Sequence, residues 1–184
     1  MNKKSGFTLA EVLVTLMIIG VIAAMTIPSL MQGTAQQEYK AALKKAVSMT
    51  NQAITMNYAL DGIDAVEYQK TSIKNLLTKR MNVMSNDASG IYTADGMYFK
   101  TSAQGTGGTN VTTVGSCIND SEDIEKMNAA SNVCAMIEVD VNGRKGPNKV
   151  TTNTGKVYDI YTLAVYPQKV LPASSVAANV LYMK

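Results

Sequence analysis

Apolar residues form one long run near the start of the chain. Residues 7–27 contain a single charged side chain, Glu11, and are otherwise apolar, glycine or hydroxyl residues. At a rise of 1.5 Å per residue, a helix of this length spans about 30 Å, the thickness of bilayer hydrocarbon. The pattern predicts a transmembrane helix over residues 7–28 with an acidic group near its start.

Beyond Pro28 the pattern changes to a stripe, with apolar residues at three- and four-residue spacing. Pro28 removes one helical hydrogen bond and is predicted to kink the helix. Residues 29–62 are predicted as an amphipathic continuation that ends near Gly62, where glycine favours a stop. We expect the stripe to pack as core on a sheet, although a partner helix in an oligomer would use the same side chains. The stripe comprises Ala35, Tyr39, Ala42, Leu43, Ala46, Val47, Ala53 and Ile54.

Residues 63–184 are predicted as a globular head. A second helix is expected over residues 64–84, and two short strands, 91–93 and 97–100, are expected to form a hairpin. Residues 135–141 alternate as in a half-buried strand, and residues 158–165 predict another. The expected fold class is α+β, with the long helix packed on a small antiparallel sheet. The buried edge of the second helix is predicted to be Ile73, Leu76, Leu77 and Met81.

The run from Gly6 to Leu13, GFTLAEVL, closely resembles the processing motif of type IV pilins and of type II secretion pseudopilins. The resemblance implies that a prepilin peptidase removes residues 1–6 by cutting after Gly6 and methylates the new amino terminus at Phe7. It also implies that Glu11 recruits the peptidase or pairs with the amino terminus of a neighbouring subunit. Pro28 stands where this family often has a proline. A secretory signal peptide or a plain signal anchor are the alternatives, but an acidic residue in the apolar run argues against both.

The cost of burying Glu11 supports an assembly role independently of the resemblance. A carboxylate inside a membrane segment costs roughly 2.5 kcal/mol or more, so it is expected to have a partner. An ammonium and a carboxylate attract strongly in low dielectric, whereas either alone is costly. Pairing with a neighbour would therefore favour joining a fibre in the correct register.

Composition excludes several function classes. Lys and Arg number 17 against 14 acidic residues, a net charge of +3, and loss of Lys3 and Lys4 with the leader leaves 15 against 14, or +1. Bulk charge therefore predicts no nucleic-acid partner. The chain has no histidine, which removes the usual catalytic triads, so an enzyme is not expected. The two leader lysines favour a cytoplasmic end, with a single pass through a bacterial inner membrane and a periplasmic or extracellular head.

Cys117 and Cys134 are the only cysteines. In a head delivered outside the cytoplasm they predict a disulfide. A loop of about 17 residues would contribute roughly 3 kcal/mol in the chain-entropy model. Two unpaired buried thiols are the alternative.

A second motif, DVNGRKGPN, begins at Asp140 and is expected between the last two strands. Oxygen side chains at Asp140 and Asn142 followed by glycine resemble the start of a calcium loop, and Asn148 and Asp159 could add ligands. Calcium is therefore a possible cofactor, and no other is expected. The favoured alternative is a tight hairpin connection built on Asn-Gly and Gly-Pro.

Together these features predict a structural subunit of an envelope filament, with a type II secretion pseudopilin as the leading assignment. A type IV pilus subunit for adhesion, motility or DNA uptake is the close alternative. A membrane-anchored extracytoplasmic binding module is the alternative of another class. The expected partners are prepilin peptidase, the inner membrane and other pilin-like subunits that pack through the amino-terminal helix.

Overall fold

The computed structural model describes residues 6–62, 73–101, 132–152 and 156–182. The chain divides into two compact units, Met1–Gln37 and Glu38–Lys184. Helix α1 (Leu9–Asp61) begins in the first unit and ends in the second. The predicted domain boundaries at residues 6, 28 and 62 stay predictions.

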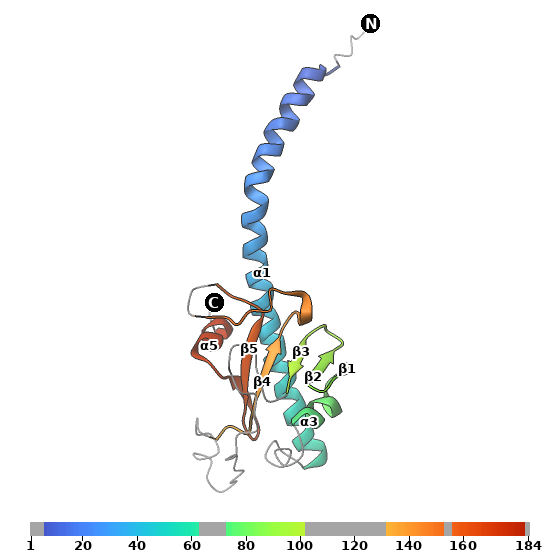
Figure 1. Ribbon diagram of the computed structural model, residues 1–184, viewed down its shortest axis with the longest axis vertical. Helices are drawn as coiled ribbons and strands as arrows, with labels where there is room; N and C mark the ends of the chain where they lie inside the picture. The colour runs from blue at the N-terminus through green and yellow to red at the C-terminus, as the bar shows by residue number, and fades with distance from the viewer. Residues whose placement is uncertain (1–5, 63–72, 102–131, 153–155, 183–184) are drawn as a thin grey trace. The chain divides into compact units, whose positions relative to one another are not determined.

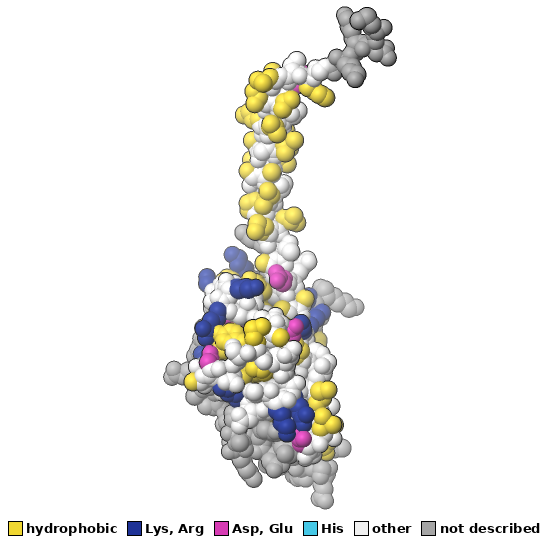
Figure 2. Space-filling view, turned by 90° about the vertical axis from the view of Figure 1, so that its right-hand side faces the viewer, with side chains coloured by type: hydrophobic (Ala, Val, Ile, Leu, Met, Phe, Trp, Pro, Cys, Tyr) yellow, Lys and Arg dark blue, Asp and Glu magenta, His cyan; other side chains and the backbone are white. Residues whose placement is uncertain are grey.

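In the first unit the large apolar side chains of α1, which run as far as Met31, are all exposed. The helix is long and apolar enough to cross a membrane, and none of its most hydrophobic window is buried within the protein. Figure 2 shows hydrophobic side chains on every visible side of this part of the helix. The hydroxyls of Thr15, Thr26 and Ser29 donate to carbonyls one turn earlier in the helix, so these groups are satisfied locally. The helix continues through Pro28, and the predicted kink stays a prediction.

In the second unit α1 is striped, as predicted. Leu43, Ala46 and Ile54 are fully buried and join the core formed with the sheet. The helix ends at Asp61, and Gly62 follows it with a positive φ of 68°, the left-handed conformation that favours glycine after a helix. The predicted end of the helix is confirmed, and so is the stripe from Tyr39 to Ile54, whereas Ala35 lies in the first unit and outside the core.

The head contains a six-stranded antiparallel sheet in which each strand pairs with the next along the chain (Figure 1). One face of this sheet packs on α1, and the side chains between the two layers form the core. The α+β fold class is confirmed. The elements after α1 are α3 (Ile73–Arg80), β1 (Val83–Asn86), β2 (Gly90–Thr93), β3 (Tyr98–Lys100), β4 (Ala135–Asp140), the 3₁₀ turn η1 (Gly143–Lys145), β5 (Ile160–Val165), β6 (Val170–Pro172) and α5 (Ser175–Tyr182).

The predicted second helix is correct in its buried edge and wrong in its end. Leu76, Leu77 and Met81 are buried and Ile73 is partly buried against the core. Residues 63–72 lie outside the described residues, and α3 stops at Arg80. Val83 and the following residues instead form β1, because they pair antiparallel with β2, a contact that local propensity does not reveal.

The strand predictions also need correction. The hairpin of β2 and β3 is confirmed, with Ile91 opposite Phe99. However, β4 is not half-buried, because Glu138 and Asp140 on its second face are buried too. Strand β5 begins at Ile160 rather than at residue 158. Neither β6 nor α5 was predicted, so the DVNGRKGPN motif lies between β4 and β5 and not between the last two strands.

One polar side chain of α1 secures the outer strand. The Asn51 amide donates to the Val170 carbonyl at 3.1 Å and accepts from the Val170 N–H at 2.7 Å. These two bonds imitate those of a neighbouring strand. Asn51 therefore satisfies part of an edge that would otherwise offer unpaired backbone groups to another chain.

Candidate processing and assembly site

The predicted cleavage junction lies outside the helix. Gly6, Phe7 and Thr8 precede α1 and have no regular secondary structure. The Phe7 side chain is 90% exposed, and the space around the Gly6 α-carbon is open. A peptidase could therefore reach the Gly6–Phe7 bond without unwinding the helix.

Thr8 and Glu11 form a reciprocal cap at the start of α1. The Thr8 N–H and the Thr8 hydroxyl each donate to Glu11 Oε2 at 2.9 Å. In return the Glu11 N–H donates to the Thr8 hydroxyl at 3.3 Å. This arrangement is a capping box, and its Thr-x-x-Glu spacing is a signal in the sequence that could have predicted it.

The cap gives Glu11 partners within its own chain. Both bonds from Thr8 end on the same oxygen, Oε2. Across the described residues, no hydrogen bond or ion pair reaches Oε1. The carboxylate can therefore begin the helix and still offer an oxygen to an additional donor.

A comparison with protein families supports this site. The family model for the prokaryotic N-terminal methylation motif matches residues 1–27. The chain carries this methylation motif, the signature of type IV pilins and pseudopilins. Proteins with the motif are structural subunits, and the motif implies processing by prepilin peptidase and assembly with other pilin subunits. No curated protein and no solved structure matches the chain.

The four candidate calcium ligands meet at the connection between β4 and β5. Both oxygens of buried Asp159 accept backbone N–H groups, from Asn148 at 2.8 Å and Lys149 at 2.9 Å. Asp140 Oδ1 accepts the Asn142 N–H at 3.2 Å, and the Asn142 amide donates to the Gly146 carbonyl at 2.9 Å. These bonds fold the connection itself, which favours the hairpin interpretation.

The acidic groups of this connection do not by themselves form a recognisable metal site. Burial, reinforced by the Asp159 carboxylate, raises the pKa of Asp140 to about 7. Within the described ranges, no group of three or more His, Cys, Asp or Glu side chains is placed to hold a metal ion. Calcium binding through Asp140, Asn142, Asn148 and Asp159 stays a prediction.

Of the two cysteines predicted to form a disulfide, the structure describes Cys134. Cys134 is 1% exposed and belongs to the core. Cys117 lies outside the described residues, so the pairing stays a prediction.

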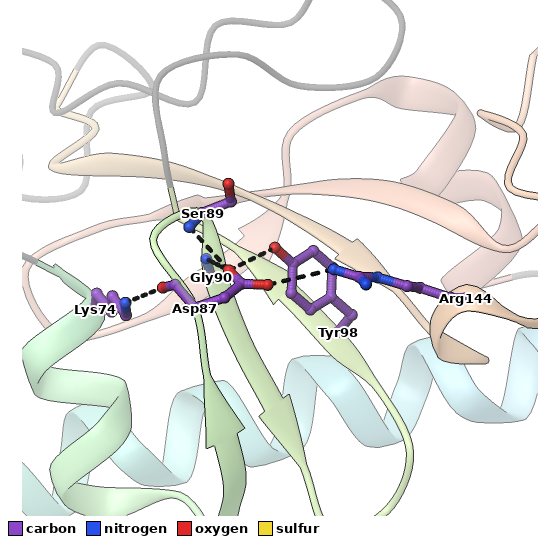
Figure 3. A network of polar contacts seen from close by, with 6 residues as sticks. All are labelled: Lys74, Asp87, Ser89, Gly90, Tyr98 and Arg144. Carbon is purple, nitrogen blue, oxygen red and sulfur yellow. Dashed lines mark hydrogen bonds and ion pairs between the residues drawn. The ribbon is translucent and has the colours of Figure 1, made fainter.

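A polar network that the sequence analysis missed holds the η1 turn on the sheet (Figure 3). The Arg144 guanidinium lies over the rings of Tyr92 and Tyr98, at 5.0 and 5.6 Å from their centroids, and pairs with Asp87 at 3.3 Å. Tyr98 donates its hydroxyl to Asp87 at 3.2 Å. Asp87 and Arg144 stand far apart in the sequence, so no local pattern reveals their contact.

The centre of this network is Asp87. Its Oδ1 accepts the N–H groups of Ser89 and Gly90, each at 2.8 Å, and its backbone carbonyl accepts a bond from Lys74. Desolvation opposes ionisation, but these backbone bonds prevail and lower the pKa of the Asp87 carboxyl. The network joins α3, the β1–β2 turn and η1, and its contacts hold these three elements together.

Proposed function

We propose that this chain is a structural subunit of an envelope filament, namely a pseudopilin of a type II protein secretion system. The observation that carries the proposal is the arrangement at residues 6–11. An exposed Gly6–Phe7 bond precedes a capped helix start, and the helix that follows is apolar over a membrane's thickness. The methylation motif matched over residues 1–27 supports the same assignment.

In this proposal prepilin peptidase cuts after Gly6 and methylates Phe7. The new ammonium then lies beside Thr8, one residue before the helix. In the assembled fibre, Glu11 Oε1 accepts the ammonium of a neighbouring subunit while Oε2 keeps the cap. The pairing compensates the charge of Glu11 in a low-dielectric environment and therefore favours assembly in one register.

The proposed location follows from the charges around the apolar run. Lys3 and Lys4 hold the amino terminus on the cytoplasmic side, and the single span places the head in the periplasm before assembly. The role is structural and needs no catalytic group in the head.

Processing can be tested by the mass of the chain recovered from membranes. Cells with prepilin peptidase should yield a chain that lacks residues 1–6 and carries one methyl group at Phe7. Gly6→Val should leave the full-length chain in the membrane, because the peptidase cannot cut. The matched control Gly20→Val changes a glycine within the span and should be processed normally. Retention of Met1 in the wild type would instead favour an anchored binding module.

Assembly can be tested by separating the charge of Glu11 from its capping function. Glu11→Gln keeps an oxygen for Thr8 but loses the charge, whereas Thr8→Val removes the hydroxyl and keeps the carboxylate. We expect Glu11→Gln and Glu11→Val to remain in the membrane and to reduce incorporation into filaments by about tenfold or more. Thr8→Val should have a smaller effect. Normal incorporation of Glu11→Gln would exclude the ion pair.

The choice between secretion and pilus can be tested in cells that lack the chain. Retention of otherwise secreted proteins, with no change in surface fibres, would support the pseudopilin assignment. Immunogold labelling of residues 29–184 along surface fibres would instead identify a type IV pilus subunit.

A further inference from the structure

We propose that the end of the head where α1 enters it binds an anionic lipid surface through four lysines, Lys40, Lys44, Lys145 and Lys149. We name these four residues the lysine collar. The inference rests on the proposed membrane anchoring and adds a second, reversible contact between the head and the same membrane.

Two sets of contacts bring the collar together. Lys45, the residue after Lys44, pairs with Asp95 in the β2–β3 turn, and Gly96 of that turn lies against Gly143 in the connection that carries Lys145. Lys149 follows in the same connection, where its N–H is held by Asp159. Lys40 and Lys44 are one turn apart on α1 and therefore project from the same side of the helix. Helix and connection thus present their lysines at one end of the head.

The collar carries an excess of accessible positive charge. Lys44, Lys145 and Lys149 are exposed and Lys40 is half-buried. Within the described part of the chain, no ion pair involves any of the four, although Lys149 lies 5.8 Å from the centroid of the Tyr158 ring. Figure 2 shows Lys and Arg side chains at this end of the head, with an acidic side chain near them and further Lys and Arg side chains at the opposite end.

Of the acidic groups near the collar, Glu38 is the one that is both exposed and unpaired among the described residues. Asp140 and Asp159 are 8% and 0% exposed, and their oxygens are bonded to backbone N–H groups. Asp95 is paired with Lys45 at 2.9 Å, which leaves Glu38 as the exposed carboxylate on the adjoining turn of the helix. Three exposed lysines and the half-buried Lys40 therefore lie beside one unpaired exposed acidic residue, Glu38.

The chain keeps the collar within reach of a membrane. Nine residues, 29–37, separate Pro28 from the first residue of the head unit. At no more than about 3.5 Å per residue they extend about 35 Å at most, and less when helical. Tethering at this range gives lipid headgroups a high effective concentration around the collar.

Lipid suits the collar better than a soluble anion does. Its ammonium groups are point charges on one side of α1 and on the β4–β5 connection, without a buried cradle for one phosphate among the described residues. Each lysine close to an anionic surface strengthens binding by roughly fivefold, and the attraction fades within the Debye length. The collar would hold the head against the membrane until the subunit is extracted into the fibre.

The test uses the full chain reconstituted into lipid nanodiscs. One set contains phosphatidylcholine alone, and the other contains three parts phosphatidylcholine to one part phosphatidylglycerol. The rate at which a water-soluble acylating reagent modifies each lysine is followed by mass spectrometry. We expect phosphatidylglycerol to slow modification of the collar lysines at least threefold at low salt, and 0.5 M NaCl to remove the difference. Lys79, on α3, should react equally in both discs.

Matched variants separate the collar from net charge. Lys145→Gln with Lys149→Gln should abolish the protection of Lys40 and Lys44, whereas Lys79→Gln with Lys169→Gln removes the same charge elsewhere and should preserve it. Equal modification rates in both discs would overturn the proposal. So would protection in phosphatidylcholine discs on adding inorganic phosphate, or protection that depends on protein concentration rather than on lipid. Protection of the apolar helix from protease in both discs reports insertion separately, so loss of insertion would count against the proposed function instead.

Discussion

Helix α1 has two parts that share one backbone geometry and face different surroundings. Up to Gln37 its large apolar side chains point outward on all sides, and the most hydrophobic window is unburied. From Glu38 onward a single stripe is buried, and the remaining faces carry lysine and other polar residues. The first part suits lipid as a solvent, whereas the second part suits water on one side and a protein core on the other.

Polar groups show the same contrast. In the first part, hydroxyls such as Thr26 bond to their own helix and need no other element. In the second part, Asn51 is committed to a strand 119 residues away, and buried Asn57 accepts a bond from Arg80 of α3. Polar side chains of the first part therefore find their hydrogen-bond partners within α1, whereas those of the second part find them in other elements of the fold.

The largest expected difference in the free energy of unfolding comes from replacing one leucine by alanine in each part. Leu43→Ala should lower the free energy of unfolding of the head by about 2–5 kcal/mol, because Leu43 is fully buried. Leu13→Ala, at a 58% exposed position, should change it by less than about 0.5 kcal/mol. Urea unfolding in detergent can be followed by tyrosine fluorescence, since all nine tyrosines lie at or after residue 39. Equal losses in the two variants would contradict the division of the helix.

Reduction should weaken the head alone. If Cys117 and Cys134 are bridged, reductant should lower the free energy of unfolding by roughly 3 kcal/mol and leave membrane insertion unchanged. The measurement is the same urea titration with and without reductant, and Cys134→Ser should make the result independent of reductant. Thiol labelling of both cysteines in the untreated protein, with equal electrophoretic mobility in both conditions, would exclude the bridge.

Asn51→Ala should have a smaller effect that is confined to one edge of the sheet. It leaves the Val170 N–H and carbonyl without the bonds from α1 and should cost about 1–3 kcal/mol. Hydrogen exchange at the Val170 amide should accelerate. Thr26→Val, the counterpart in the first part, should change the unfolding free energy by less than about 0.5 kcal/mol, because its hydroxyl serves only its own helix. An unchanged exchange rate at Val170 would contradict the role given to Asn51.

Calcium should have the smallest effect. A ligand at ten times its dissociation constant stabilises the folded state by about 1.4 kcal/mol. Calcium-dependent melting that Asp140→Ala abolishes, and that Asp95→Ala keeps, would establish the site at the β4–β5 connection. Unchanged melting of the wild type with calcium would leave the connection as a hairpin closed by its own hydrogen bonds.

Sequence patterns were most informative where the controlling interaction is local. The hairpin of β2 and β3 was predicted because its strands adjoin their turn. In the short strand β1, by contrast, three of the four residues are exposed, and the strand forms by pairing with β2. The second face of β4 reads as polar in the sequence, yet Glu138 and Asp140 are buried there.

The sequence alone determined the apolar span, the position of Glu11 and the stripe of α1, and it predicted the processing junction, since each depends on residues within a few turns of one helix. Tertiary structure decided how Asn51 secures β6, how Asp87 receives Arg144, and how Gly143 meets the hairpin turn. At Gly143, φ is +69° and an added Cβ would lie 2.5 Å from the Gly96 carbonyl oxygen, so a side chain is excluded by a contact 47 residues distant in the chain. Such contacts depend on chain segments that meet only after folding, and the hydrophobic periodicity of the sequence does not predict them.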